Sequence, residues 1–263
     1  MPVRMLVAAS TMLAVTIPLA AQTLQSRVAA SDGVVQIVYP SRPSVCGDGQ
    51  TYIGNVFGSS RTYSGDVSWS GRNGWTNREC VHGPARVVAN VVGGEFTRVR
   101  AYVGPVPSTS SDVRTISTTA ADASAWMGEL LTSGPPRVAS DMILPLILAD
   151  GPEPWPLLLK VARDENRSRD LKRNVMLWLS NGVSEHLGLI DADDGSSDDD
   201  EMRKQAIYVL TQRPKNESIP QLIELARSAK HPSARKTAIY WLGQTGDARA
   251  VDVYAELLGL RSR

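Results

Sequence analysis

The chain has few of the side chains, and none of the short motifs, that mark common enzyme classes. Its 263 residues include only three histidines, which stand apart in the sequence at His82, His186 and His231. It contains no His-Glu-x-x-His, Gly-x-Ser-x-Gly or Gly-x-x-x-x-Gly-Lys-Ser/Thr motif. An enzyme of unrecognised type would have to assemble its site from both halves of the chain. The sequence therefore predicts a protein that is not an enzyme and that needs no cofactor.

A surplus of charge of either sign is also missing. The chain has 28 Lys and Arg against 27 Asp and Glu, a net charge of +1. This balance excludes a nucleic-acid binder held mainly by phosphate neutralisation, and a hydrophobic content of 42% excludes a wholly disordered tail. All six lysines lie beyond residue 155, whereas Arg is the only cation between residues 22 and 119. This shift in composition predicts two domains of different construction.

Long apolar runs are absent except at the N-terminus. Arg4 precedes residues 5–17, which are apolar or small throughout, and Pro-Leu-Ala-Ala follows at 18–21. This pattern is typical of a secretory signal peptide and is too short to span a bilayer. We therefore expect a periplasmic or secreted protein that begins near Gln22 and has no membrane span after signal removal. The alternative is an N-terminus that is retained as an anchor.

Cysteine is scarce, and both residues lie in the first half, at Cys46 and Cys80. In an exported chain, two cysteines in one small domain most often form a disulfide. The alternative is a metal site made by Cys46 with Asp48 and Cys80 with His82, but no further cysteine completes a tetrahedral set. The sequence predicts a disulfide and no metal.

The first half carries strand patterns. Residues 34–39 form a β-branched run that ends at Pro40, and two further runs, 86–92 and 95–103, flank Gly93-Gly94. Such a Gly-Gly pair between β-branched runs predicts a hairpin. Shorter strand-like pieces occur at 51–57 and 66–70. We expect a small β-rich domain over residues 22–107.

Two features of this first half leave its role open. Trp69 and Trp75 lie among Gly and polar residues, which is compatible with a glycan- or peptide-stacking surface, although a Trp in so small a domain is more often core. Residues 108–119, rich in Ser and Thr, predict a linker to the second domain.

The second half repeats itself. Residues 201–212 and 233–244 are identical at seven of twelve positions with a shift of 32, and residues 170–181 and 139–150 are weaker copies at shifts of 31. Helical patterns at 155–163, 219–227 and 251–258 accompany the copies, with Pro156 and Pro220 near two of the expected helix starts. A period of this length predicts stacked helix pairs.

The segment 233–251 resembles the short HEAT-like repeat that is also found in phycobilisome-lyase-type proteins. The resemblance covers about residues 120–263 and implies an α-solenoid of about four helix pairs that holds another protein along its second helices. The chain is thus expected to be an α+β two-domain protein. The lyase activity of some relatives is not implied, because this half contains no cysteine and the repeat itself specifies no chemistry.

Helical periodicity divides the second helices into a core face and an outer stripe. The predicted core positions are Leu171, Val175, Trp178, Leu179, Met202, Ala206, Val209, Leu210, Ala234, Ala238, Trp241 and Leu242. The predicted partner-binding stripe comprises Arg173, Lys204, Lys236, Leu177, Tyr208, Tyr240, Asn181, Gln212 and Gln244. The alternative for this stripe is a solvated face whose tyrosines pack between repeats.

An acidic run precedes the third copy, with Asp191, Asp193, Asp194, Asp198, Asp199, Asp200 and Glu201. It fails the EF-hand pattern, since Gly195 stands at the fifth position and Met202 replaces the bidentate Glu. We expect a solvated loop, and cation binding stays open.

Taken together, these patterns predict an exported, non-enzymatic scaffold that binds a protein or peptide on its solenoid. The alternative is a cell-envelope binder that holds glycan or peptide on the β-rich domain, with the solenoid as support. The oligomeric state and the identity of the partner are not encoded in any pattern of the sequence.

Overall fold

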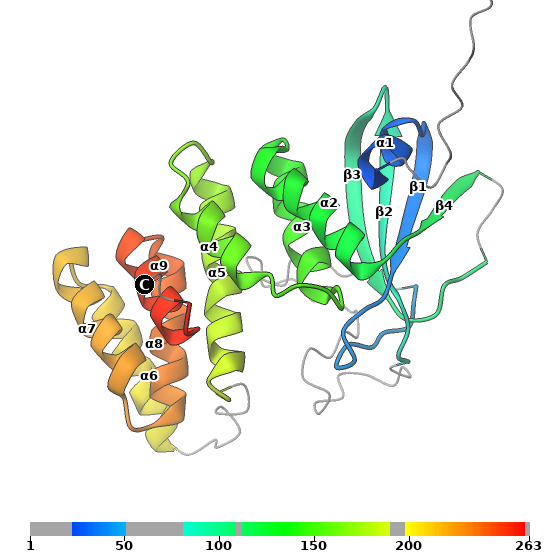
Figure 1. Ribbon diagram of the computed structural model, residues 1–263. Helices are drawn as coiled ribbons and strands as arrows, with labels where there is room; N and C mark the ends of the chain where they lie inside the picture. The colour runs from blue at the N-terminus through cyan, green and yellow to red at the C-terminus, as the bar shows by residue number, and fades with distance from the viewer. Residues whose placement is uncertain (1–22, 51–80, 109–111, 190–197, 261–263) are drawn as a thin grey trace, which may run out of the picture.

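A computed structural model of the protein describes residues 23–50, 81–108, 112–189 and 198–260 (Figure 1). A β-sheet stands at one end and a row of helices extends away from it. The predicted signal segment, the predicted strands at 51–57 and 66–70, Trp69, Trp75 and Cys80 lie outside the described residues, as does most of the acidic run. The α+β class predicted from the sequence is confirmed.

The sheet has four strands in the order β3-β2-β1-β4. They are β1 (Gly33–Tyr39), β2 (Ala85–Val92), β3 (Glu95–Val103) and β4 (Val113–Ser117). Strand β2 pairs antiparallel with both β1 and β3. Gly93 and Gly94 join β2 to β3 with φ angles of 59° and 81°, a left-handed conformation that glycine adopts without steric cost. The predicted hairpin is therefore confirmed.

Strand β4 lies within residues 108–119, for which the sequence predicts a linker. It pairs in parallel with β1, with Val34 beside Val113 and Val38 beside Ser117. Ile116, at 2% exposure, points into the core. Residues 113–117 of the predicted linker therefore belong to the sheet.

One face of the sheet packs against helices. Val35, Ile37 and Val87 are completely buried on this face. The helices around it are α1 (Leu24–Ala29), α2 (Ala120–Ser133) and α3 (Pro136–Leu148), of which α3 packs directly on β2 and β3. The buried Tyr39 hydroxyl donates to the Pro145 carbonyl of α3 at 3.0 Å. A continuous apolar core therefore runs from the sheet into the first helices.

The repeated segments form helices as predicted. They are α4 (Trp155–Arg163), α5 (Arg169–His186), α6 (Asp198–Thr211), α7 (Lys215–Ser228), α8 (Pro232–Thr245) and α9 (Ala248–Leu257). Ser168 caps α5 by accepting from the Leu171 N–H at 3.3 Å, which satisfies one of the free donors of the first turn. Pro156 lies at a helix start as expected, but Pro220 lies inside α7, because that helix begins already at Lys215.

The helices do not stack in chain order. Helix α8 packs against α5 on one side and against α6 and α7 on the other, while α9 packs beside α4. Along the molecule the order is therefore α3, α5, α8, α6, with the C-terminal pair α8–α9 between α5 and the α6–α7 pair (Figure 1). Helix α6 is the last of this row.

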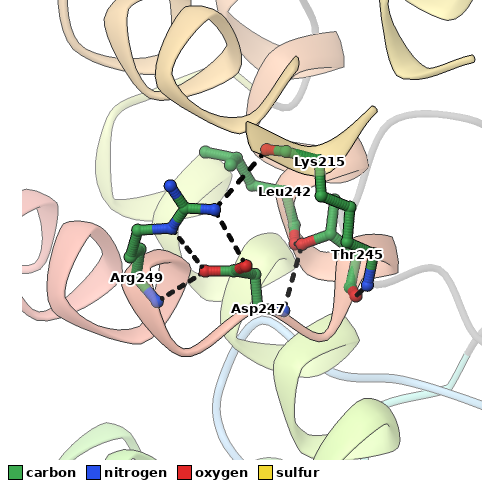
Figure 2. Close-up of polar contacts among 5 residues, drawn as sticks. All are labelled: Lys215, Leu242, Thr245, Asp247 and Arg249. Atoms are coloured by element: carbon green, nitrogen blue, oxygen red, sulfur yellow. Dashed lines mark hydrogen bonds and ion pairs between the residues drawn. The ribbon is translucent and has the colours of Figure 1, made fainter. Parts of the chain in front are cut away.

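A polar joint fixes the point where α7 begins, α8 ends and α9 begins (Figure 2). The Lys215 ammonium donates to the Thr245 carbonyl at 3.0 Å, and Arg249 Nε donates to Asp247 Oδ1 at 2.8 Å. The hydrogen bond from Arg249 holds the pKa of the Asp247 carboxyl below its ordinary value. Asp247 also accepts from the Arg249 N–H at 3.0 Å, so it caps α9 and orients that helix beside α8.

Candidate functional site

The predicted core face holds for two of the three repeated helices. On α5 all four predicted positions are buried, and on α8 Ala234, Ala238 and Leu242 are buried while Trp241 is half-buried. On α6 the prediction is wrong at three of the four positions, because Met202 is 63% exposed, Val209 is 53% exposed and Ala206 is exposed as well. The fourth, Leu210, is half-buried and packs against the core. Among the described helices α6 is the end of the row, so none of them neighbours this face, and Ile207 is buried instead.

A groove lies between α5, α8 and α6, with a volume of about 430 Å³. We call it the α5–α8–α6 groove. Of the predicted partner-binding stripe, five residues line it: Asn181, Lys204, Tyr208, Lys236 and Tyr240. Its other lining residues are Ser180, Ser184, Glu201, Gln205, Thr237 and Trp241. The structure therefore brings together cations, rings and amides from three helices that are far apart in the sequence.

The rings of this groove are both packed and accessible. Tyr208 of α6 lies 5.5 Å from Trp241 of α8, and Tyr240 lies 5.4 Å from the same indole, measured between ring centroids. Tyr208 and Tyr240 nevertheless keep exposures of 42% and 38%. Both interpretations of the tyrosines thus apply, since they contact a neighbouring ring and still present apolar surface to solvent.

The groove is lined by charged side chains of both signs. Lys204 Nζ lies 3.0 Å from Glu201 Oε1 one turn earlier on α6. Lys236 enters the same groove from α8. An ion pair at the surface contributes little to stability, so Lys204 can exchange Glu201 for a carboxylate of a ligand at small cost.

The other four residues of the predicted stripe do not line this groove. Arg173 lines a separate basic cavity of about 490 Å³ with Arg169, Lys172 and Lys215, and forms an ion pair with Asp170 at 3.0 Å. Leu177 is buried at 8% exposure, because α5 lies inside the row between α3 and α8. Gln212 is exposed and Gln244 is half-buried.

On the α5 side of the groove the sequence singled out Asn181 but not two serines. Ser180 and Ser184 lie one turn apart there, and both are buried. Each hydroxyl donates to a carbonyl of its own helix, at 2.7 Å and 2.9 Å respectively. The signal in the sequence is the small size of both residues, which lets the groove reach the α5 backbone.

The β-rich part has a cavity of its own, of about 650 Å³, at the end of β1. Pro40, Pro43 and Pro84 line it together with His82, whose Nδ1 lies 3.1 Å from the Val45 carbonyl oxygen. Since Trp69 and Trp75 lie outside the described residues, the glycan- or peptide-stacking surface stays a hypothesis. Cys46 is buried at 7% exposure, and its pairing with Cys80 stays a prediction.

The described residues show neither a cluster of metal ligands nor a membrane-spanning helix. In the ranges that the structure describes, no three His, Cys, Asp or Glu residues gather as a metal site would require. Asp191, Asp193 and Asp194 lie outside those ranges, so cation binding by the acidic run stays open. Across the same ranges, every helix is too short or too polar to cross a bilayer.

Comparison with known protein families finds a match for the last four helices. The family model for HEAT repeats matches residues 190–262, which contain α6, α7, α8 and α9. No curated protein matches the chain, and no solved structure matches it. The resemblance detected in the repeated segments is thereby confirmed over this range. Residues 190–262 of the chain are therefore similar to HEAT repeats, and a four-stranded β-sheet precedes them.

Proposed function

We propose that the protein is an exported, non-catalytic scaffold that binds a protein or peptide partner in the α5–α8–α6 groove. HEAT repeats generally mediate protein–protein interaction, and their stacked helices provide an extended surface for it. The observation that carries the proposal is the convergence of Lys204, Lys236, Tyr208 and Tyr240 on one cavity from two neighbouring repeats.

The lining of the groove indicates the chemistry of the partner. Two ammonium groups attract carboxylates, and partly exposed tyrosine rings offer apolar contact area at low entropic cost. The Asn181 amide, at the α5 wall, has donors and an acceptor for a peptide backbone. We therefore expect the groove to hold an acidic segment that also carries apolar side chains.

Charge reversal in the groove tests this proposal. In the variant with Lys204→Glu and Lys236→Glu, peptides selected on the wild-type chain from a displayed library are expected to lose affinity about tenfold or more, because two attractive charges become repulsive. Fluorescence anisotropy with synthetic copies of those peptides measures the loss. The selected peptides are also expected to be richer in Asp and Glu than the library.

A matched control reverses two exposed lysines that do not line the groove, Lys160→Glu and Lys230→Glu. This variant has the same net charge and is expected to bind as the wild type does. If both variants lost affinity equally, the loss would be explained by the change in net charge and not by the groove. Full binding by the groove variant would refute the groove as the contact surface.

The export part of the proposal rests on the N-terminal pattern and on the cysteines. Cys46 is buried, and the part of the chain that the structure describes holds no free cysteine. Mass spectrometry of the secreted or periplasmic protein is expected to show a chain that begins near Gln22, is two protons lighter than its reduced form and carries no zinc. Two free thiols in the exported protein would overturn the predicted disulfide.

A further inference from the structure

Helix α6 presents an apolar face that none of the described residues covers. We call it the open face of α6 and define it as Met202, Gln205, Ala206 and Val209, which one side of the helix brings together. Met202 and Val209 are 63% and 53% exposed. The opposite side, with Ile207 at 6% exposure, packs toward α8. The open face is distinct from the α5–α8–α6 groove except for Gln205.

The repeat shows what kind of surface this face is. Its counterparts 32 residues later on α8 are Ala234, Ala238 and Trp241, and there the face is covered. The cover is α6 itself, since Tyr208 packs on Trp241 and the Asp200 carboxylate accepts from the Ser233 hydroxyl at 2.9 Å. Helix α8 thus uses this face to receive α6, the next helix of the row, and on α6 no described helix follows.

A second copy of the chain offers one matching surface. In each copy, α5 is already covered by α3 and α8, and α8 is covered by α5 and α6. The apolar helix face left over in the described part of that copy is again the open face of α6. Two identical faces that meet each other form a closed pair around a twofold axis.

We propose that the open face of α6 joins two copies of this chain, with the two α6 helices antiparallel across a twofold axis. In that arrangement Met202 of one copy lies near Val209 of the other, and the two Ala206 residues lie near the axis. Ala at the centre permits a close approach of the two helices, and the larger apolar side chains close the ends.

The charges along α6 favour the antiparallel orientation. Glu201 is exposed near the start of the helix, and the exposed Arg213 follows its last turn. An antiparallel pair places the acidic start of one helix beside the basic end of the other, whereas a parallel pair would place like charges together. A contact made by one helix pair falls below about 1,200 Å² in total, so the dimer is weak and depends on concentration.

Sedimentation equilibrium of the full chain over a series of concentrations tests the proposal. The wild type is expected to pass from monomer to dimer as concentration rises. Val209→Glu is expected to raise the dissociation constant at least tenfold, because it places two like charges in the contact. The control is Val92→Glu, since Val92 is also 63% exposed but lies on β2, and it is expected to dimerise as the wild type does.

The orientation has its own test. Arg213→Glu is expected to weaken the dimer, and the double variant with Glu201→Arg is expected to restore it, since the swap rebuilds complementary charge at both ends. A wild type that stays monomeric at every concentration, or a Val209→Glu variant that dimerises unchanged, would overturn the proposal. An unaffected Arg213→Glu dimer would overturn the antiparallel arrangement. Val209 and Arg213 do not line the groove, so the results for Val209→Glu and Arg213→Glu are independent of partner binding.

Discussion

Ala238→Asp is expected to unfold the C-terminal repeats, whereas Ala206→Asp, the same change at the matching position one repeat earlier, is expected to leave them folded. Ala238 has no exposed surface and lies on α8, the helix that contacts α5, α6 and α7. A carboxylate placed there is taken out of water, and burying it costs several kcal/mol. That is a large part of the total stability of about 5 to 15 kcal/mol for a typical domain.

Ala206 lies on the open face of α6, where a carboxylate stays in water. Substitutions at exposed positions usually change stability by about 0.5 kcal/mol or less. Circular dichroism melts at low protein concentration, where the proposed dimer is dissociated, measure the difference. The Ala238→Asp variant is expected to lose helix content at ambient temperature, and Ala206→Asp is expected to melt within a few degrees of the wild type.

This pair of variants also tests the order of the helices. A row in chain order would place α6 between α5 and α8 and bury Ala206 as deeply as Ala238. Equal damage from the two substitutions would therefore contradict the order α3, α5, α8, α6 that the structure shows. The two sites differ in packing alone, because their immediate neighbours in the sequence are nearly the same.

Helix positions follow from the sequence because they depend on local repetition. The copies at 201–212 and 233–244 predict α6 and α8 to within a few residues. The failure at Met202 and Val209 has a different origin. Periodicity identifies which side of a helix is apolar, but it does not tell whether another helix covers that side. The order of the helices in the row is set by contacts between residues far apart in the sequence, and the pattern of a single repeat does not reveal these contacts.

The candidate site also has residues that could be predicted from the sequence and residues that could not. Lys204 with Lys236, and Tyr208 with Tyr240, could be predicted together because they hold equal offsets in two copies whose helices are neighbours. Leu177 holds the same offset on α5, yet it is buried because α5 has helices on both sides. The alignment of the α6 and α8 copies does not predict which helices pack on either side of α5.

Strand β4 shows a further limit. Its residues 113–117 lie in a Ser- and Thr-rich segment, which by composition predicts a linker. The strand is stabilised by parallel pairing with β1, whose residues lie 79 positions earlier. Ile116 is the one strongly apolar residue that enters the core from it. A pairing strand that far away in the sequence lies outside the short sequence windows from which secondary structure is predicted.

Gly104→Ala is expected to destabilise the β-rich part by about 2 to 6 kcal/mol. Gly104 has a φ angle of 110°, which residues with a side chain rarely adopt and which costs about 1 to 3 kcal/mol. A Cβ atom would also lie 2.8 Å from the Gly49 nitrogen and closer still to the Gly47 carbonyl oxygen. Overpacking of this kind adds about 1 to 3 kcal/mol.

The backbone around Gly104 cannot easily move aside. The Gly49 N–H donates to the Val103 carbonyl at 2.8 Å, and the Gly47 N–H donates to the Val81 carbonyl at 3.0 Å, so both glycines are tied to neighbouring chain segments. Relief of the clash would break these bonds near Cys46 and the end of β3. The cost therefore combines a strained φ, a steric overlap and lost hydrogen bonds.

Gly93→Ala is the matched control. Gly93 also has a positive φ, 59°, but a Cβ atom there would meet nothing within 4 Å. Its cost is expected to be only the left-handed penalty of about 1 to 2 kcal/mol. Urea unfolding of the two variants gives the difference in the free energy of unfolding. If Gly104→Ala loses no more stability than Gly93→Ala, the backbone of residues 47–49 does not lie against Gly104 in solution, because the strained φ alone would then account for the whole effect.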